Sequence, residues 1–137
     1  MEPKLKLVFV DDCVFQQAMM KMLIKRMEIF DLYFTCNDGA ELIDRLVDSD
    51  FLPEICILDL HMPHMGGIAT AHEISARFPD INVFGYTASG DEEEIEDFKR
   101  NGAVHIFSKT NPRSMLDQIY LWTNGTDPFD ENTICPI

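Results

Sequence analysis

Short apolar runs alternate along the chain with stretches in which apolar residues recur every three or four positions. Runs rich in β-branched and aromatic residues predict strands, and recurrence at three or four positions predicts amphipathic helices. We predict strands at Leu5 to Val10, Leu32 to Cys36, Ile55 to Leu60, Val83 to Thr87 and Val104 to Ser108. We predict helices over about 14–27, 39–47, 68–78, 92–100 and 112–122.

Strands that alternate with helices across short loops predict parallel βα units and a sheet covered on both faces. The expected architecture is therefore a three-layer α/β sandwich. In such sheets ligands bind outside the carboxyl ends of the strands. From Thr123 onward the periodicity stops, so we expect one domain over residues 1–122 and a tail or interdomain linker over 123–137.

The polar residues that follow the predicted strands suggest the chemistry. Asp11 and Asp12 follow the first strand, Asp59 ends the third, Thr87 ends the fourth and Lys109 follows the fifth. Crowded carboxylates repel one another unless a cation offsets their charge. Oxygen ligands of this kind suit Mg²⁺, which commonly also binds phosphate oxygens.

This set of groups fits phosphoryl transfer. The reaction needs an in-line nucleophile and donors for the phosphoryl oxygens more than it needs a base. Asp59 is the candidate nucleophile, forming an aspartyl phosphate. Lys109 and Thr87 are the candidate donors.

The composition of the chain limits which partners and which location we expect. Lys and Arg number 11 and Asp and Glu 24, a formal net charge of −13, which disfavours direct binding to nucleic acid or to an anionic membrane face. No apolar run approaches the roughly 20 residues of a membrane span, and the N-terminus does not resemble a signal peptide. The four cysteines, at 13, 36, 56 and 135, lack disulfide-scaffold or metal spacing, so we expect a cytoplasmic location.

The chain resembles two-component response-regulator receiver domains over about residues 4 to 122. The resemblance rests on Asp11-Asp12, the signature Asp59-x-x-Met62-Pro63-x-Met65-x-Gly67, Thr87-Ala88 and Lys109, in the family's order and spacing. It implies a flavodoxin-like doubly wound (βα)5 fold with the parallel strand order 2-1-3-4-5.

The resemblance also implies roles and partners. Asp59 would accept phosphate from a sensor histidine kinase or a phosphotransfer protein. Asp12, Asp59 and the backbone carbonyl of His61 would contact Mg²⁺, with Asp11 acting largely through water, while Thr87 and Lys109 would bind the phosphoryl oxygens. The signal would pass through the fourth helix, fifth strand and fifth helix to an output domain or effector, or to a second copy in a phosphorylation-dependent homodimer. Such a phosphoacceptor assists its own phosphorylation and dephosphorylation without turning over an external substrate.

Two positions depart from the family pattern. Ile106 stands where an aromatic switch residue is usual, and Phe107 is expected to point to the opposite face of its strand. We therefore expect loop and fourth-helix movement to carry the signal. Thr110 stands where a cis proline usually follows the lysine, and a non-proline cis bond there would need strong enforcement by the site.

Other functions remain open at this point. An aspartate-nucleophile phosphatase of the haloacid-dehalogenase type would want an acid at the position of His61, and a flavodoxin would want a Ser/Thr/Gly-rich phosphate loop after the first strand. Within the receiver interpretation, the chain is either a stand-alone module or the input part of a longer regulator, and we slightly favour the longer regulator.

Overall fold

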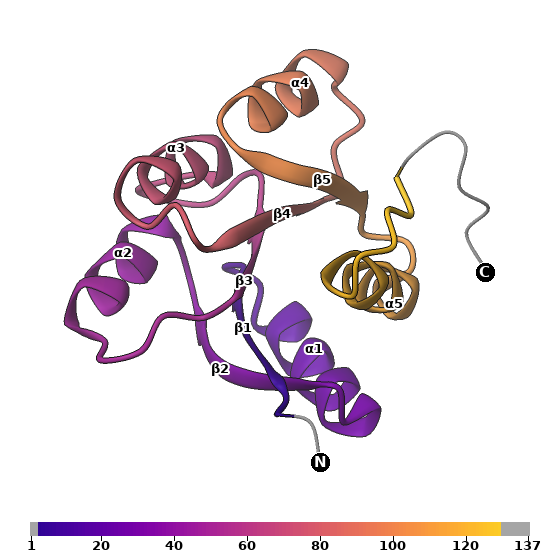
Figure 1. Cartoon of the computed structure of the whole chain (residues 1–137). Coiled ribbons are helices and arrows are strands. Elements are labelled where there is room, and N and C mark those ends of the chain that lie inside the picture. Colours follow the sequence, from indigo (N-terminus) through magenta and orange to yellow (C-terminus); the bar gives the residue numbers. More distant parts are fainter. Residues whose placement is uncertain (1–2, 130–137) are drawn as a thin grey trace.

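The computed structural model describes residues 3–129 of the chain, and over this range five strands alternate with five helices (Figure 1). The strands are β1 (Leu5–Val10), β2 (Phe30–Cys36), β3 (Ile55–Asp59), β4 (Asn82–Thr87) and β5 (Ala103–Ser108). The helices are α1 (Val14–Met27), α2 (Gly39–Asp48), α3 (Gly67–Arg77), α4 (Glu92–Arg100) and α5 (Pro112–Thr123). Each predicted strand and helix is confirmed, with small differences at the ends.

The strands form one parallel sheet in the order β2-β1-β3-β4-β5. Helices α1 and α5 cover one face, and α2, α3 and α4 cover the other (Figure 1). The expected three-layer sandwich and strand order are therefore confirmed. All carboxyl ends of the strands lie along the same edge of the sheet, because the strands are parallel.

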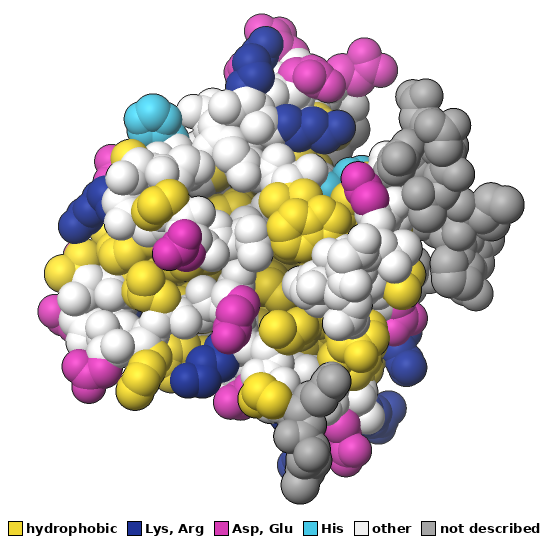
Figure 2. All heavy atoms as spheres, viewed as in Figure 1, with side chains coloured by type: hydrophobic (Ala, Val, Ile, Leu, Met, Phe, Trp, Pro, Cys, Tyr) yellow, Lys and Arg dark blue, Asp and Glu magenta, His cyan; other side chains and the backbone are white. Residues whose placement is uncertain are grey.

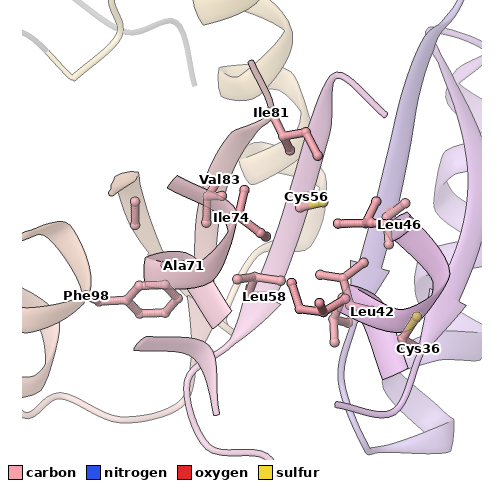
Figure 3. Packing of buried hydrophobic residues seen from close by; sticks show 14 of the residues in the cluster. Cys36, Leu42, Leu46, Cys56, Leu58, Ala71, Ile74, Ile81, Val83 and Phe98 are labelled. Carbon is pink, nitrogen blue, oxygen red and sulfur yellow. The ribbon is translucent and has the colours of Figure 1, made fainter. Parts of the chain in front are cut away.

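The central strands are buried on both faces, and their side chains alternate between two hydrophobic clusters. Val8 and Val10 of β1 pack on the side of α2, α3 and α4, whereas Leu7 and Phe9 pack on the side of α1 and α5. Figure 3 shows part of the first cluster, in which Phe98 of α4 points toward the core beside α3. Such double burial explains why these strands read as nearly continuous apolar runs.

The edge strand β2 differs from its prediction. It begins at Phe30 rather than Leu32, and the register with β1 shifts so that Leu7 pairs with Leu32 but Val8 pairs with Phe34. The extra residue, Tyr33, is a β-bulge and reverses the alternation. Leu32 consequently packs with the α1 and α5 side, and Phe34 with the opposite side.

Helix α4 has little of its own surface in the core. Among its residues, all of which the structure describes, only Phe98 is buried. The Phe98 ring lies against two glycines: a Cβ built at Gly67 or at Gly85 would come within 2.9 Å of it. Two positions without side chains thus make room for the one aromatic ring that holds α4 to the sheet.

The described part of the predicted tail packs against β5. Pro128 is buried, and the Phe129 ring stacks on His105 at a centroid distance of 4.1 Å with 6° between the planes. The assignment of residues 123–137 as tail or linker stays a prediction, and Cys135 lies outside the described residues. Within residues 3–129 no helix combines the length and apolar character needed to cross a membrane.

We expect Gly67→Ala to lower the free energy of unfolding by about 1–3 kcal/mol, because the added methyl group would overpack this site. Its Cβ would lie 2.4 Å from the backbone carbonyl oxygen of Asp59, an atom that cannot turn away as a side chain can. Urea unfolding monitored by circular dichroism measures the change. The matched control is Gly90→Ala, whose Cβ has no described atom within 4 Å. Equal stability of the two variants would contradict the contact.

Candidate functional site

Four strand ends bring the predicted side chains to one edge of the sheet. Asp11 follows β1 and is fully buried, Asp12 beside it is exposed, and Asp59 at the end of β3 is 8% exposed. Thr87 ends β4 and is buried, and Lys109 follows β5. The carboxylates come from β1 and β3, which are neighbours in the sheet although far apart in the sequence.

Lys109 joins the carboxylates. Its Nζ donates a hydrogen bond of 2.7 Å to Oδ2 of Asp11 and lies 3.3 Å from Oδ2 of Asp59. Its backbone N–H donates to the carbonyl oxygen of Thr87 at 3.0 Å, which fixes the start of the β5–α5 loop against the end of β4. One ammonium therefore compensates two buried carboxylates.

The carboxylates also have backbone donors. Oδ1 of Asp11 accepts from the N–H of Cys13 at 2.9 Å, and Oδ1 of Asp59 accepts from the N–H of Leu60 at 2.8 Å. Both side chains are thus held at one oxygen by the loop that follows them. The direct contact between Asp11 and Lys109 was not foreseen from the sequence.

One carboxylate oxygen from each of Asp11, Asp12 and Asp59 lies within 4.8 Å of the others. An all-oxygen donor set containing one exposed carboxylate fits Mg²⁺, which is commonly bound by one or two carboxylates and completes its coordination with water. The exposed position of Asp12 leaves the cluster open to solvent. The residues present therefore fit the ion that the sequence predicted.

The surroundings shift the proton affinities of two groups. Burial, and then the negative charge of Asp11, raises the pKa of Asp59, while Lys109 and the Leu60 N–H offset part of this rise. Burial opposes the charge on Lys109, but its hydrogen bond with Asp11 and the two carboxylate charges outweigh burial and raise the pKa of Lys109. The ammonium therefore stays charged at neutral pH.

The Thr87 hydroxyl and the peptide bond after Lys109 complete the description of the site. The Thr87 hydroxyl accepts a hydrogen bond from the N–H of Ser89 at 3.0 Å, and its own O–H is left to donate. Within residues 3–129 there is no cis peptide bond, so Lys109 and Thr110 are joined by a trans bond. This agrees with the cost of a non-proline cis bond.

The sequence prediction of the site missed two neighbouring contacts. The Tyr86 ring lies below the ammonium, with Nζ of Lys109 5.4 Å from its centroid. On the exposed side, His61 Nε2 lies 2.6 Å from Oε2 of Glu94, so the loop after Asp59 touches the first turn of α4. His61 is exposed, and its partner had no signal in the sequence.

Ile106 and Phe107 face opposite sides of β5, as predicted. Ile106 packs with the cluster that contains Phe98, and Phe107 packs with the cluster on the α5 side. A pocket of about 270 Å³ beside Ile106 is lined by Thr87, by the loop residues Ala88, Ser89 and Gly90, and by Ile95 of α4, together with Phe107 and Ser108. Free space therefore lies between the end of β4 and α4.

Comparison of the sequence with known proteins identifies a family whose members it resembles. The family model described as "Response regulator receiver domain" matches residues 7–120. The chain is 30% identical over 105 residues to the chemotaxis protein CheY of Listeria monocytogenes, covering 77% of this chain and 86% of that protein. It is 31% identical over 114 residues to the oxygen regulatory protein NreC of Staphylococcus epidermidis, covering 82% of this chain and 51% of that protein.

A solved structure agrees with these matches. A chain of the CheX-CheY-BeF3-Mg²⁺ complex from Borrelia burgdorferi has a TM-score of 0.78 and 25% identity, over 88% of this chain and 89% of that chain. The present chain thus spans most of the CheY relative but about half of the NreC relative.

We expect Asp59→Asn to raise the free energy of unfolding at pH 7. Because its pKa is raised in the folded protein, Asp59 binds a proton more tightly when folded than when unfolded, so stability is lost as pH rises from its ordinary pKa, about 3.9, through the raised value. The amide keeps the shape without the charge, and its advantage should shrink below about pH 4. Urea unfolding at several pH values measures this. Asp31→Asn, an exposed acid on β2, is the control, and an equal gain there would contradict the explanation.

Proposed function

Because the chain belongs to the response regulator receiver domain family, we propose that Asp59 accepts a phosphoryl group from a phosphohistidine on a sensor histidine kinase or a phosphotransfer protein. The observation that carries this proposal is the contact of Lys109 with both Asp11 and Asp59 inside a cluster of three carboxylates. Receiver domains are signalling phosphoacceptors and in general do not turn over an external substrate. The family match over residues 7–120 favours this function over the phosphatase and flavodoxin alternatives.

The proposed step is an in-line displacement. A carboxylate oxygen of Asp59 forms a bond to phosphorus as the bond from phosphorus to the donor's histidine nitrogen breaks, and the released imidazole takes a proton from water. Asp59 enters as the carboxylate, which is the nucleophilic form. The hydrogen bond from Leu60 holds one of its oxygens.

We propose that Mg²⁺ is held by Asp12, by Asp59 and by the backbone carbonyl of His61, with Asp11 contributing largely through water. Receiver domains bind Mg²⁺ at an acidic pocket, and the three-carboxylate cluster supports the same for this chain. When bound, the ion offsets the charge of the carboxylates and of the phosphoryl oxygens. The Borrelia burgdorferi complex, which is named for its Mg²⁺ and BeF3, is consistent with this choice of ion.

Lys109 and Thr87 are proposed to bind the phosphoryl oxygens. Lys109 already lies 3.3 Å from the Asp59 oxygen, so a short movement brings it to a group attached there. The Thr87 hydroxyl can donate without giving up the hydrogen bond that it accepts from Ser89. The phosphoryl oxygens would thus gain one charged and one neutral donor.

The start of α1 is a surface on which the phosphoryl donor could dock. Val14 and Phe15 are 76% and 74% exposed, and only Cys13 separates them from Asp12. Exposed apolar side chains beside a reactive group commonly mark a contact surface. We propose that the kinase or phosphotransfer protein rests on them while its histidine reaches Asp59.

For the output we propose movement of α4 and of the loop before it. Ile106 has no ring to rotate. Helix α4, in contrast, contacts the loop that follows Asp59, because Glu94 pairs with His61. The Phe98 ring of α4 also packs against Gly67. The pocket between Thr87 and Ile95 gives this movement room. Figure 2 shows acidic side chains together with basic ones at the end of the molecule formed by α4. The acids fill the first turn of α4 and the bases its last turn, so a basic partner surface would complement the first turn.

The partner is proposed to be the output domain of a longer regulator, an effector protein or a second copy of the domain, in the cytoplasm. Two kinds of relative bear on this choice: the CheY relative matches over most of its length, and the NreC relative over about half. We favour an output domain, as in a longer regulator. The net charge of −13 argues against direct binding of nucleic acid by this domain.

Incubation with acetyl phosphate and Mg²⁺ is expected to label the chain with one phosphoryl group, and Asp59→Asn is expected to abolish the labelling. Intact-protein mass spectrometry measures the added mass. Chelation of Mg²⁺ with EDTA should reduce labelling strongly in the wild type, and Asp12→Ala should lose most of the Mg²⁺ dependence. Equal labelling of Asp59→Asn would remove Asp59 as the acceptor.

Beryllofluoride, a stable mimic of the phosphoryl group, is expected to shift the backbone amide resonances of α4 when Mg²⁺ is present. The expected cause is loss or rearrangement of the contact between His61 and Glu94. Two-dimensional ¹H–¹⁵N spectra measure the shifts, and the amides of α2 provide the internal comparison because α3 lies between α2 and α4 (Figure 1). Unchanged α4 amides in a protein that binds beryllofluoride would contradict readout through this helix.

A further inference from the structure

Tyr86 occupies a central position under the site. It directly precedes Thr87 on β4 and is the register partner of Asp59 across the β3–β4 pair. Its side chain is fully buried on the α1 and α5 side of the sheet. Nζ of Lys109 lies 5.4 Å from the centroid of its ring, within the range of a cation–π contact.

The Tyr86 ring is itself held in place from two directions. Its hydroxyl donates a hydrogen bond of 3.3 Å to Oε1 of Gln16 in the first turn of α1. Its ring and the Phe9 ring of β1 pack in a T-shaped arrangement, at a centroid distance of 5.9 Å and an angle of 61°. A fully buried ring fixed by a hydrogen bond and an aromatic neighbour has little freedom to turn away from Lys109.

The lysine side chain has a flexible four-carbon stem, so Lys109 could reach the two carboxylates in several conformations if nothing else held it. We propose that Tyr86 is a positioning residue that holds the Lys109 ammonium over its ring, between Asp11 and Asp59. This inference rests on the proposed function of Lys109 in binding the phosphoryl group, and adds the group that fixes the lysine for that role.

The ring supplies an attraction that does not depend on the charge of Asp59. When a phosphoryl group joins Asp59, the negative charge moves from the carboxylate to the new oxygens, so the contact between Lys109 and Asp59 must change. Asp11 and the Tyr86 ring remain where they are. Lys109 can then shift to the phosphoryl oxygens while two of its three contacts persist.

The first test measures the position of Lys109 without phosphorylation. In the wild type, the ring current of Tyr86 should move the ε-methylene proton resonances of Lys109 upfield of those of exposed lysines. Tyr86→Phe should keep this shift and Tyr86→Leu should lose it. Lys109 resonances at the ordinary lysine position in the wild type would overturn the proposal, and this measurement requires no variant to fold.

The second test measures the rate constant of phosphorylation by phosphoramidate at saturating Mg²⁺. We expect Tyr86→Leu to reduce it about threefold to tenfold, which lies within the range of cation–π contacts, and Tyr86→Phe to stay within about twofold of the wild type. Phe84→Leu is the matched control, because Phe84 is a fully buried aromatic residue of the same strand and the same cluster. An equal reduction in the control would overturn the proposal.

A double-variant comparison separates positioning from general loosening of the core. Added to Lys109→Ala, Tyr86→Leu should reduce the rate no further, because the group that it positions is gone. A further threefold loss in that background would overturn the proposal. If the wild type is not phosphorylated at all, the proposed function fails, and the resonance measurement still decides where Lys109 lies.

Discussion

Charge compensation at the carboxyl edge of the sheet is the constraint on which the rest of the site depends. Parallel strands bring Asp11 and Asp59 together, and removing two negative charges from water is costly unless a partner is close. Lys109 reaches both of them from the far side of β4. The sheet order therefore has an electrostatic consequence, because β1 and β3 carry the acids and β5 carries the cation that compensates them.

The negative charge of the carboxylates is only partly compensated by Lys109. One ammonium faces two buried carboxylates, and the pKa of Asp59 is raised first by burial and then by the negative charge of Asp11. A fully neutralised cluster would gain less from binding a divalent cation. In this cluster a cation would relieve an existing repulsion, because it would add positive charge beside carboxylates that one ammonium only partly compensates.

Local patterns were sufficient to predict most of the fold, and contacts between distant segments were not. The strands buried on both faces, such as β3, were evident as apolar runs, and the predicted start of α4 near residue 92 is confirmed, where the side chain of Asp91 accepts from the N–H groups of Glu93 and Glu94. The start of β2 was missed because Asp31 interrupts the apolar pattern. The bulge at Tyr33 was missed because an inserted residue changes the pairing without changing the composition.

The candidate site shows the same division. The positions of Asp11, Asp59 and Lys109 at strand ends could be predicted, because each ends or follows an apolar run. The Tyr86 ring and the pair of His61 with Glu94 could not, since they depend on how separate elements pack in space. Alternation along β4 would have assigned Tyr86 to the core, but nothing in the sequence placed Lys109 above it.

The packing of α4 has a consequence for how such domains diverge. A helix that is joined to the core through one buried ring, Phe98, leaves its other positions exposed or half-buried. Substitutions at those positions change little of the packing that folds the domain. The surface of α4 can therefore acquire a new binding specificity independently of the carboxylate cluster, so related chains can differ in their partners while they keep the same cluster.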